Sequence, residues 1–331
     1  MKTTNSRLHE LLASAALTTG EGEYRYAVEH DWLTLPPGLA WGDTHGLALD
    51  QQGNIYVAHT VGADCACADA IYVFDRAGNF RASFGTEFRG GAHGLAIRRE
   101  PEGEFIYVSD VARGLVAKLT LTGRCVWAAE RPRDLPLYAA GGVKPFSPTN
   151  FAFAPCGDLF VADGYGSNHI LRYDRDGHCV GAIAARQGGH GGLKCPHGLI
   201  VDTRGDEPRL VVADRGNFRL QVFTLEGRHL RTVQDQERLR WPCHFDQRGD
   251  LLVCPDLDSQ VCLLDREYRV VAQLGDGRFA NGALGSRRGQ TRDQFTPGKF
   301  ITPHAAIFLG AGDLLVAEWL PIGRITRLRR L

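Results

Sequence analysis

A short pattern of three strand-like runs recurs six times along the 331 residues, and this repeat restricts the fold more than any other feature. In each copy an apolar run is followed by a run rich in β-branched residues and then by a run that alternates apolar and polar residues. The copies begin at His45, His93, Asn150, His197, His244 and His304. Their spacing of 47 to 60 residues suits a four-stranded blade with loops of variable length. The sequence therefore predicts an all-β, six-bladed β-propeller with antiparallel blades.

The two ends of the repeat predict how the ring closes. The sixth copy stops after its third run at Leu331, which would leave an unpaired and aggregation-prone edge. A separate strand-like run from Tyr24 to Leu35 precedes the first copy. We expect it to supply the missing fourth strand of the last blade, so that residues 24–331 form a single propeller domain and residues 1–23 an N-terminal extension.

The extension and the overall composition restrict the possible cellular location and partners of the protein. The run LHELLASAAL suggests two or three turns of helix, but it is short and Glu10 interrupts it, so we expect no signal peptide. No stretch approaches the ~18 apolar residues of a membrane span. Basic and acidic residues balance at 38 each, so we expect neither a nucleic acid nor a membrane as a partner. We interpret the nine cysteines as reduced thiols of a cytoplasmic protein, with the Cys65/Cys67 pair as a minor metal-binding candidate.

The loops predict which face of the propeller carries a site. The residue before each first strand and the residues after each second strand should lie on one face near the axis. Three long connections, 61–70, 131–147 and 276–302, should open on this same face. The last two contain glycine and proline and could arch over the axis as lids.

Histidines are concentrated at that predicted face. Five of the six first strands begin with histidine and the remaining one with Asn150. Alternate blades are related by a three-fold turn, so His93, His197 and His304 could converge on one point, as could His45 and His244 with Asn150. Three neutral imidazoles with open positions form a catalytic zinc arrangement. The alternative to metal binding is a structural role, in which these side chains cap the blade ends or hold water in the channel.

A second group of polar residues follows the second strands. These positions are His59, Asp110, Asp163, Asp214, Pro255 and Glu318. Aspartates at such turns commonly accept backbone amides, so we expect Asp110, Asp163 and Asp214 to be structural. Tyr165 lies between two glycines, and an arginine such as Arg215 beside a metal suits a substrate carboxylate. A surface tyrosine and a surface arginine remain the alternative for these two.

Several of these segments resemble a known family. The runs SDVARGLVAKL at Ser109, ADGYGSNHILRY at Ala162, PHGLIVD at Pro196 and ADRGNFRLQVF at Ala213 look like NHL-repeat propellers. In particular, they resemble the catalytic core of peptidyl-α-hydroxyglycine α-amidating lyase. The resemblance is strong in blades two to four and rests on the repeat pattern alone in the others.

This resemblance implies a function and a set of roles. In that lyase, three blade histidines hold a metal that binds the hydroxyl of a carbinolamide, and a tyrosine takes up a proton as the C–N bond breaks. By matching motif, His93, His197 and His304 would hold zinc or another divalent transition metal, Tyr165 would be the general base, and Arg215 would bind the carboxylate. The expectation is a metal-dependent lyase that cleaves a C–N or C–O bond at a hydroxylated carbon of a small-molecule or peptide-like substrate.

The sequence also departs from the lyase pattern. The His-Asp pair of the family's last blade, whose aspartate helps to bind a structural calcium, is His304-Ala305 here, so we do not expect calcium. The family's arginine after the second strand of blade one falls at Thr60, beside His59, so the substrate pocket should differ. Two other functional classes stay open. One is a non-catalytic NHL-repeat binding scaffold, and the other is a propeller lactonase or hydrolase, which Asn150 and Glu318 would favour.

Overall fold

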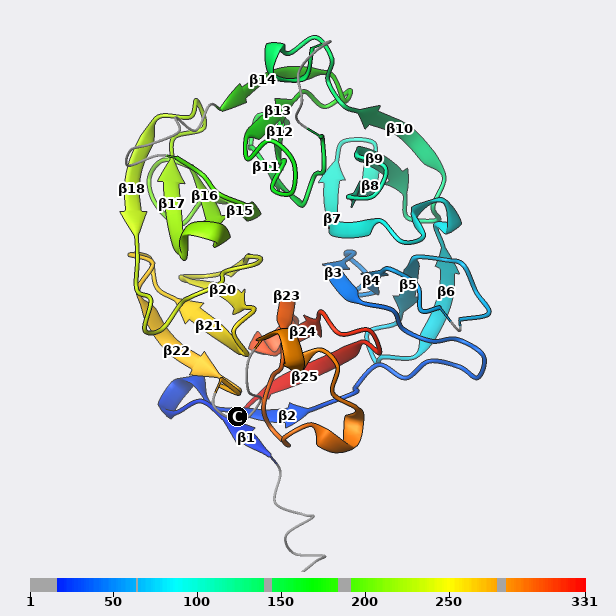
Figure 1. The fold of residues 1–331 in the computed structure, drawn as a ribbon. Coiled ribbons are helices and arrows are strands. Elements are labelled where there is room, and N and C mark those ends of the chain that lie inside the picture. The colour runs from blue at the N-terminus through cyan, green and yellow to red at the C-terminus, as the bar shows by residue number, and fades with distance from the viewer. Residues whose placement is uncertain (1–16, 64, 140–144, 184–191, 279–283) are drawn as a thin grey trace, which may run out of the picture.

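The computed structural model describes residues 17–63, 65–139, 145–183, 192–278 and 284–331, and they build a ring of six four-stranded antiparallel blades (Figure 1). Blade one consists of β3 (Thr44–Leu49), β4 (Ile55–His59), β5 (Ile71–Phe74) and β6 (Phe80–Phe84), and blade two of β7 (Ala92–Glu100), β8 (Gly103–Asp110), β9 (Leu115–Thr120) and β10 (Cys125–Glu130). Blade three consists of β11 (Asn150–Phe153), β12 (Leu159–Ala162), β13 (Ile170–Tyr173) and β14 (Cys179–Ile183), and blade four of β15 (Pro196–Asp202), β16 (Arg209–Asp214), β17 (Arg219–Phe223) and β18 (His229–Val233). Blade five consists of β19 (Asp246–Arg248), β20 (Leu251–Asp256), β21 (Gln260–Leu264) and β22 (Val270–Leu274).

The sixth blade closes the ring as the sequence predicts. Its strands are β23 (Pro303–Phe308), β24 (Leu314–Glu318), β25 (Arg324–Arg330) and β2 (Tyr26–Glu29), with β1 (Thr18–Thr19) added at the edge. Strand β2 lies antiparallel to β25, with Val28 opposite Leu328. The N-terminal segment therefore supplies the missing fourth strand, and β1, which belongs to the predicted extension, pairs with it in turn. The helix predicted over LHELLASAAL lies outside the described residues, except for Leu17.

Helical segments in the described part of the chain are short. They are η1 (Gly22–Tyr24), η2 (Thr86–Phe88), η3 (Pro136–Tyr138), η4 (Arg215–Asn217), α2 (Leu284–Arg287), η5 (Arg292–Gln294) and η6 (Gly310–Gly312). None of them is long and apolar enough to cross a membrane.

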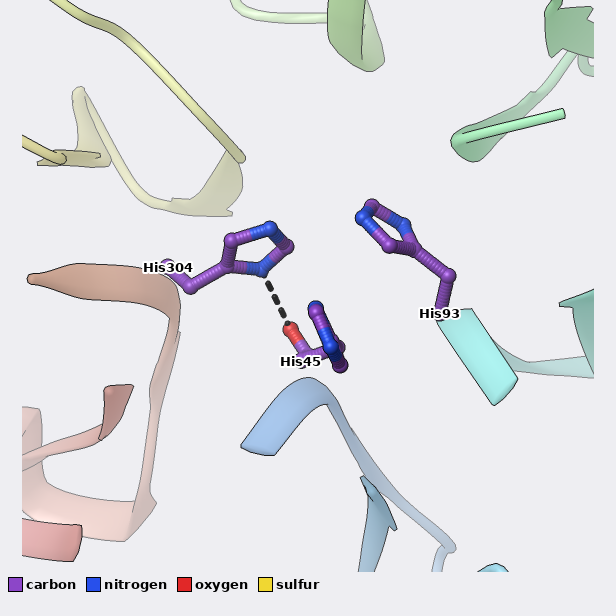
Figure 2. Close-up of side chains that lie close together, drawn as sticks. All are labelled: His45, His93 and His304. Carbon is purple, nitrogen blue, oxygen red and sulfur yellow. Dashed lines mark hydrogen bonds between the residues drawn. The ribbon is translucent and has the colours of Figure 1, made fainter. Parts of the chain in front are cut away.

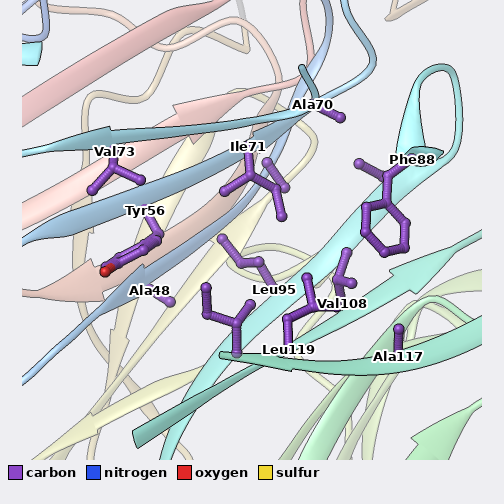
Figure 3. Close-up of a cluster of buried hydrophobic side chains, with 13 residues drawn as sticks. Ala48, Tyr56, Ala70, Ile71, Val73, Phe88, Leu95, Val108, Ala117 and Leu119 are labelled. Atoms are coloured by element: carbon purple, nitrogen blue, oxygen red, sulfur yellow. The ribbon is translucent and has the colours of Figure 1, made fainter. Parts of the chain in front are cut away.

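The core consists of six apolar clusters, one between each pair of neighbouring blades. Side chains alternate along a strand, so β16 contributes Val211 to the cluster shared with blade five and Val212 to the cluster shared with blade three. Figure 3 shows the cluster between blades one and two, where Ile71 of β5 faces Leu95 and Leu119. Middle strands are buried on both faces, which explains their nearly continuous apolar runs.

The first strands of the blades lie closest to the axis of the ring. In Figure 1 the first strands β3, β7, β11, β15 and β23 lie nearest the axis, and the fourth strands β6, β10, β14, β18, β22 and β2 lie at the rim. The fourth strands alternate between exposed and half-buried residues because only one face is covered. The starts of β3, β7, β11, β15 and β23 are therefore brought together around the axis.

Candidate metal centre and active site

Four imidazoles meet where the first strands begin. His45, His93, His197 and His304 are the second residues of β3, β7, β15 and β23. In each case the pairing with the second strand shifts at this point, and such a bulge re-aims the side chain. The ring centroids of His93, His197 and His304 lie 4.9, 4.8 and 4.7 Å apart in pairs. The structure thus brings the rings of the three histidines that the motif selects close together, although the histidine ligand atoms that lie close enough to share one metal ion belong to His45, His93 and His304.

His45 joins this group, which the three-fold argument does not anticipate. Its ring centroid lies 4.6 Å from that of His93 and 4.8 Å from that of His304 (Figure 2). Blade one lies between blades six and two, so its histidine fits between theirs. One nitrogen from each of these three histidines lies within 4.8 Å of the others, close enough to hold a metal ion.

Backbone hydrogen bonds fix the tautomer of three of these histidines. The Nδ1 atoms of His93, His197 and His304 lie 2.8, 2.7 and 2.9 Å from the carbonyl oxygens of Thr149, Cys243 and His45. A carbonyl only accepts, so each Nδ1 carries the proton and each Nε2 presents a lone pair. Metal-binding histidines are oriented in this way by their second nitrogen.

The fourth imidazole carries an unused polar atom. Among the described residues His45 Nδ1 is buried and has no hydrogen-bond partner. Burial lowers the pKa of all four imidazoles, to about 3 for His93, so they are neutral at ordinary pH. Buried polar atoms without partners are uncommon, and neutral imidazoles are suitable ligands for divalent transition metals. This donor set therefore fits a metal such as zinc.

The glycine after the histidine allows the next blade to approach. A Cβ at Gly94 would lie 2.5 Å from the Thr149 carbonyl oxygen, and one at Gly198 would lie 2.4 Å from that of Cys243. These two oxygens are the partners of His93 and His197. The His-Gly pairs of the sequence thus combine a ligand with the space that its hydrogen-bond acceptor needs.

We expect Gly198→Ala to lower the free energy of unfolding by about 1–3 kcal/mol, because the new methyl group pushes the Cys243 carbonyl away from His197. Urea denaturation measures this loss. Gly181→Ala is the matched control, since a Cβ there meets nothing within 4 Å. Equal stability of the two variants would contradict this account of the motif.

Tyr165 and Arg215 complete the site. The Tyr165 hydroxyl lies 3.2 Å from Nε2 of His93 and 3.0 Å from Nε2 of His197, and it accepts an N–H from Arg215 Nη2 at 3.2 Å. The side chain of Tyr165 is 42% exposed, yet its hydroxyl is enclosed by these three groups. The guanidinium also lies over the phenol ring, 5.4 Å from its centroid. The two residues selected from the sequence thus reach the histidine cluster.

A pocket of about 420 Å³ opens beside this cluster. Its walls contain His304, Tyr165 and Arg215 together with residues that sequence reasoning missed. These are Lys194, Cys195, Gly216, Phe218, Trp241, Leu257 and Trp319. A signal for one of them exists: Trp319 follows Glu318 as Arg215 follows Asp214, so the two occupy matching positions of their blades.

The second predicted set is arranged differently. His244 and Asn150 line a cavity of about 710 Å³ among residues of the first strands, whereas His45 belongs to the cluster described above. The Nδ1 atom of His244 lies 3.2 Å from the carbonyl oxygen of Ala306, two residues beyond His304. Strand β19 begins only at Asp246, so His244 precedes the regular pairing and sits at another level of the channel.

His59 has a structural environment. Its Nδ1 accepts the backbone N–H groups of Gly42 and Val61, and its ring packs against Trp41 and Tyr72. Burial lowers its pKa to about 4. His59 is the last residue of β4 and not the first residue after it, and its side chain supports the turn.

This lowered pKa predicts a loss of stability in acid. An unfolded His59 takes up a proton near pH 6.5 and the folded one only near pH 4, so its contribution is present above pH 6.5 and disappears as the pH falls toward 4. Between pH 8 and pH 5 this single residue should cost about 2 kcal/mol. We expect His59→Gln, compared with wild type by urea denaturation in the presence of a chelator, to show a pH dependence weaker by that amount. An unchanged pH dependence would contradict it.

The acidic residues at these positions hold the loops, as expected for the aspartates. Asp163 accepts the backbone N–H groups of Ser147 and Ser167. Glu318, for which no structural role was predicted, accepts that of Ile301 and pairs with the buried Arg324. In blade five the acidic residue is Asp256, one position beyond Pro255. Asp256 ends β20 and accepts the N–H groups of Arg240 and Trp241, since β20 runs one residue further than the pattern suggested.

The long connections are only partly described. Residues 64, 140–144 and 279–283 lie outside the described part, and so the proposed lids, 131–147 and 276–302, cannot be traced as continuous segments. Cys65 accepts a hydrogen bond from the Ala40 N–H and contacts the Tyr72 hydroxyl. Among the described residues the pair Cys65/Cys67 has no third metal-ligating group beside it.

Known proteins support the resemblance that the motifs indicate, and no protein-family model matches the sequence. A protein of Caenorhabditis elegans named probable peptidyl-alpha-hydroxyglycine alpha-amidating lyase is 23% identical over 314 residues, which cover 89% of this chain and 85% of that protein. Peptidyl-glycine alpha-amidating monooxygenase A of Xenopus laevis is 28% identical over 242 residues, 62% of this chain but only 24% of that protein. NHL repeat-containing protein 3 of Mus musculus is 25% identical over 57% of this chain and 51% of its own length.

Solved structures support the fold. A streptogramin B lyase superposes with a TM-score of 0.60 at 14% identity, covering 93% of this chain and 99% of its own. A virginiamycin B lyase from Staphylococcus aureus superposes with a TM-score of 0.57 at 12% identity, covering 92% of this chain and 100% of its own. At these identities the likeness establishes the propeller alone.

Proposed function

We propose that this protein is a metal-dependent lyase that cleaves the C–N bond at a hydroxylated carbon of a small carboxylate at the axial mouth. The observation that carries this proposal is the position of the Tyr165 hydroxyl between Nε2 of His93 and Nε2 of His197, with Arg215 donating to it. The similarity to proteins named amidating lyase supports the same reaction class.

The metal ligands in this proposal are His93, His197 and His304, with His45 beside them. Neutral imidazoles favour zinc or another divalent transition metal. Such a metal would supply Lewis acidity to an oxygen of the substrate. The chain itself provides the orientation, because three backbone carbonyls hold the Nδ1 atoms and turn the Nε2 atoms toward one another.

Tyr165 and Arg215 have distinct roles in the proposed reaction. Arg215 binds the substrate carboxylate and so places the hydroxylated carbon beside the phenol. Tyr165, as phenolate, takes the hydroxyl proton; a C=O bond forms, the C–N bond breaks, and the proton passes to the departing nitrogen. The products are an amide and glyoxylate. Burial raises the pKa of Tyr165, which disfavours the phenolate, and the charge of Arg215 opposes this effect only in part. In this proposal a metal held by the histidines would lower that pKa further and so favour the phenolate.

The substrate in this proposal is a small molecule or a peptide-like compound. Nucleic acid is not part of it, because the chain carries as many acidic as basic residues. Hydrolysis of a lactone is a less suitable reaction for this site, because Glu318, which that reading needs, is engaged with Ile301, Thr302 and Arg324.

The direct test is glyoxylate release from an N-acyl α-hydroxyglycine by protein stripped with a chelator and then reloaded with zinc. We expect the stripped protein to be inactive and the reloaded protein to form glyoxylate and amide in equal amounts. A folded wild-type protein that neither contains nor takes up a transition metal would overturn the proposal and favour a binding scaffold.

A further inference from the structure

The pocket beside the histidine cluster has a second part that the proposed reaction does not use. Tyr165, Arg215 and His304 line the pocket together with four apolar side chains, those of Phe218, Trp241, Leu257 and Trp319. Phe218 and Trp241 are stacked, with ring centroids 6.1 Å apart and planes at 25°. We call these three aromatic side chains and the leucine the aromatic wall of the pocket.

The charges around the pocket have one sign. Among the described residues that line it, Arg215 and Lys194 are charged and none is a carboxylate. The acids that end the neighbouring second strands, Asp214, Asp256 and Glu318, are completely buried and accept hydrogen bonds from the chain. The pocket is therefore suited to an anion with an apolar body.

The aromatic wall is held in place from outside the pocket. The guanidinium of Arg288, which does not line the pocket, lies 3.5 Å from the centroid of the Trp319 ring. Asp43 fixes that guanidinium through a salt bridge of 2.6 Å. Trp319 is thus oriented before any ligand binds, which reduces the entropy cost of binding.

Phe218 occupies a backbone position that disfavours it. It ends η4 with φ of +57°, in the left-handed region where glycine or asparagine is usual, and its side chain is 38% exposed. Strained backbone of this kind clusters at active sites and ligand clamps. Here the ring forms part of the pocket wall and stacks on Trp241.

We propose that this wall binds an aromatic group of the substrate, so that the protein acts on small α-hydroxyglycines whose nitrogen carries an aromatic acyl group. This inference rests on the proposed function for the hydroxylated carbon, but the aromatic preference itself is a property of binding. Arg215 holds the carboxylate, and the aryl group extends from the acyl side along Phe218, Trp241 and Trp319.

Calorimetric titration of the zinc-loaded protein with unreactive analogues tests this assignment. N-benzoylglycine should bind about tenfold more tightly than N-acetylglycine, as expected for one buried aromatic contact. N-benzoylglycinamide, which lacks the carboxylate, should bind more weakly than N-benzoylglycine. Equal affinity for the benzoyl and acetyl compounds would overturn the inference.

The variant Phe218→Gly distinguishes an effect on ligand binding from an effect on protein stability. The variant should melt at a higher temperature, because glycine tolerates this backbone conformation, and yet lose most of the preference for the benzoyl compound. Ala311→Gly is the matched control: Ala311 has φ of +60° in the turn between β23 and β24, so it should also gain stability but keep the preference. Trp319→Ala should remove the preference as well. An unchanged preference in Phe218→Gly and Trp319→Ala would refute the assignment.

The two proposals fail in different ways. An aromatic preference in binding, without glyoxylate from the hydroxylated N-benzoyl compound, would leave the pocket assignment intact and refute the lyase function. Glyoxylate release that is equally efficient from the acetyl and benzoyl compounds, without a preference in binding, would refute the pocket assignment and leave the lyase function intact.

Discussion

Replacing His304 with alanine should remove nearly all of the transition metal from the purified protein. His304 belongs both to the set that the motif selects and to the cluster with His45 and His93, so every arrangement of ligands loses a member. Changes outside the ligands commonly cost about 10–100-fold in metal affinity, and the loss of a ligand should exceed this. Metal content by mass spectrometry and competition with a chelator measure the effect.

His244→Ala is the control for this experiment, because His244 also begins a propeller repeat but lies in the channel cavity. It should keep its metal. Parallel variants His45→Ala and His197→Ala then distinguish the two overlapping sets: the histidine whose loss lowers the affinity more is the stronger ligand. Full metal content in folded His304→Ala would contradict the site.

Phenylalanine at Tyr165 should reduce glyoxylate release by about 10²–10⁴-fold, the usual contribution of a positioned proton-transfer group. The ring, its contact with Arg215 and the wall of the pocket are retained, so substrate binding and metal content should change little. Comparing kcat with KM and metal content separates a proton-transfer role from a structural one.

Tyr24→Phe is a suitable control for Tyr165→Phe, since Tyr24 lies in η1 at the edge of the sixth blade, far along the chain from the site. It should have wild-type activity. If Tyr165→Phe lost metal and activity to the same extent, the role of the tyrosine would instead be to position the histidines.

The fold could be predicted almost completely because it depends on local patterns. Every blade reuses the same alternation of buried and exposed residues, so six copies of a weak signal confirm one another. Ring closure by Tyr26–Glu29 followed from counting strands in the last blade. The blades rest on residues close in sequence, where spacing alone fixes which side chains share a face. Ring closure joins the two ends of the chain, but the count of strands was enough to predict it.

The site could be predicted only in part, because it depends on how the blades are rotated and how far each chain enters the channel. The convergence of His93, His197 and His304 follows from symmetry. The three-fold argument does not include His45, which joins from the blade between those of His93 and His304, nor the separate place of His244, which precedes β19. The aromatic wall escaped notice because Phe218, Trp241 and Trp319 come from three connections with no shared motif.

The pairing of β2 with β25 has a consequence for the order of events during folding. Contacts in the last blade join positions 300 apart in the chain, as in the ion pair between Glu29 and Arg329. Such pairings have the highest contact order in the molecule and form late, because a long loop must close before they contribute. During synthesis the early strand β2 must wait for β25, the last to emerge, with its apolar residues Tyr26 and Val28 uncovered. While the chain is being synthesised, β2 therefore has no strand to pair with until β25 of the last blade has formed.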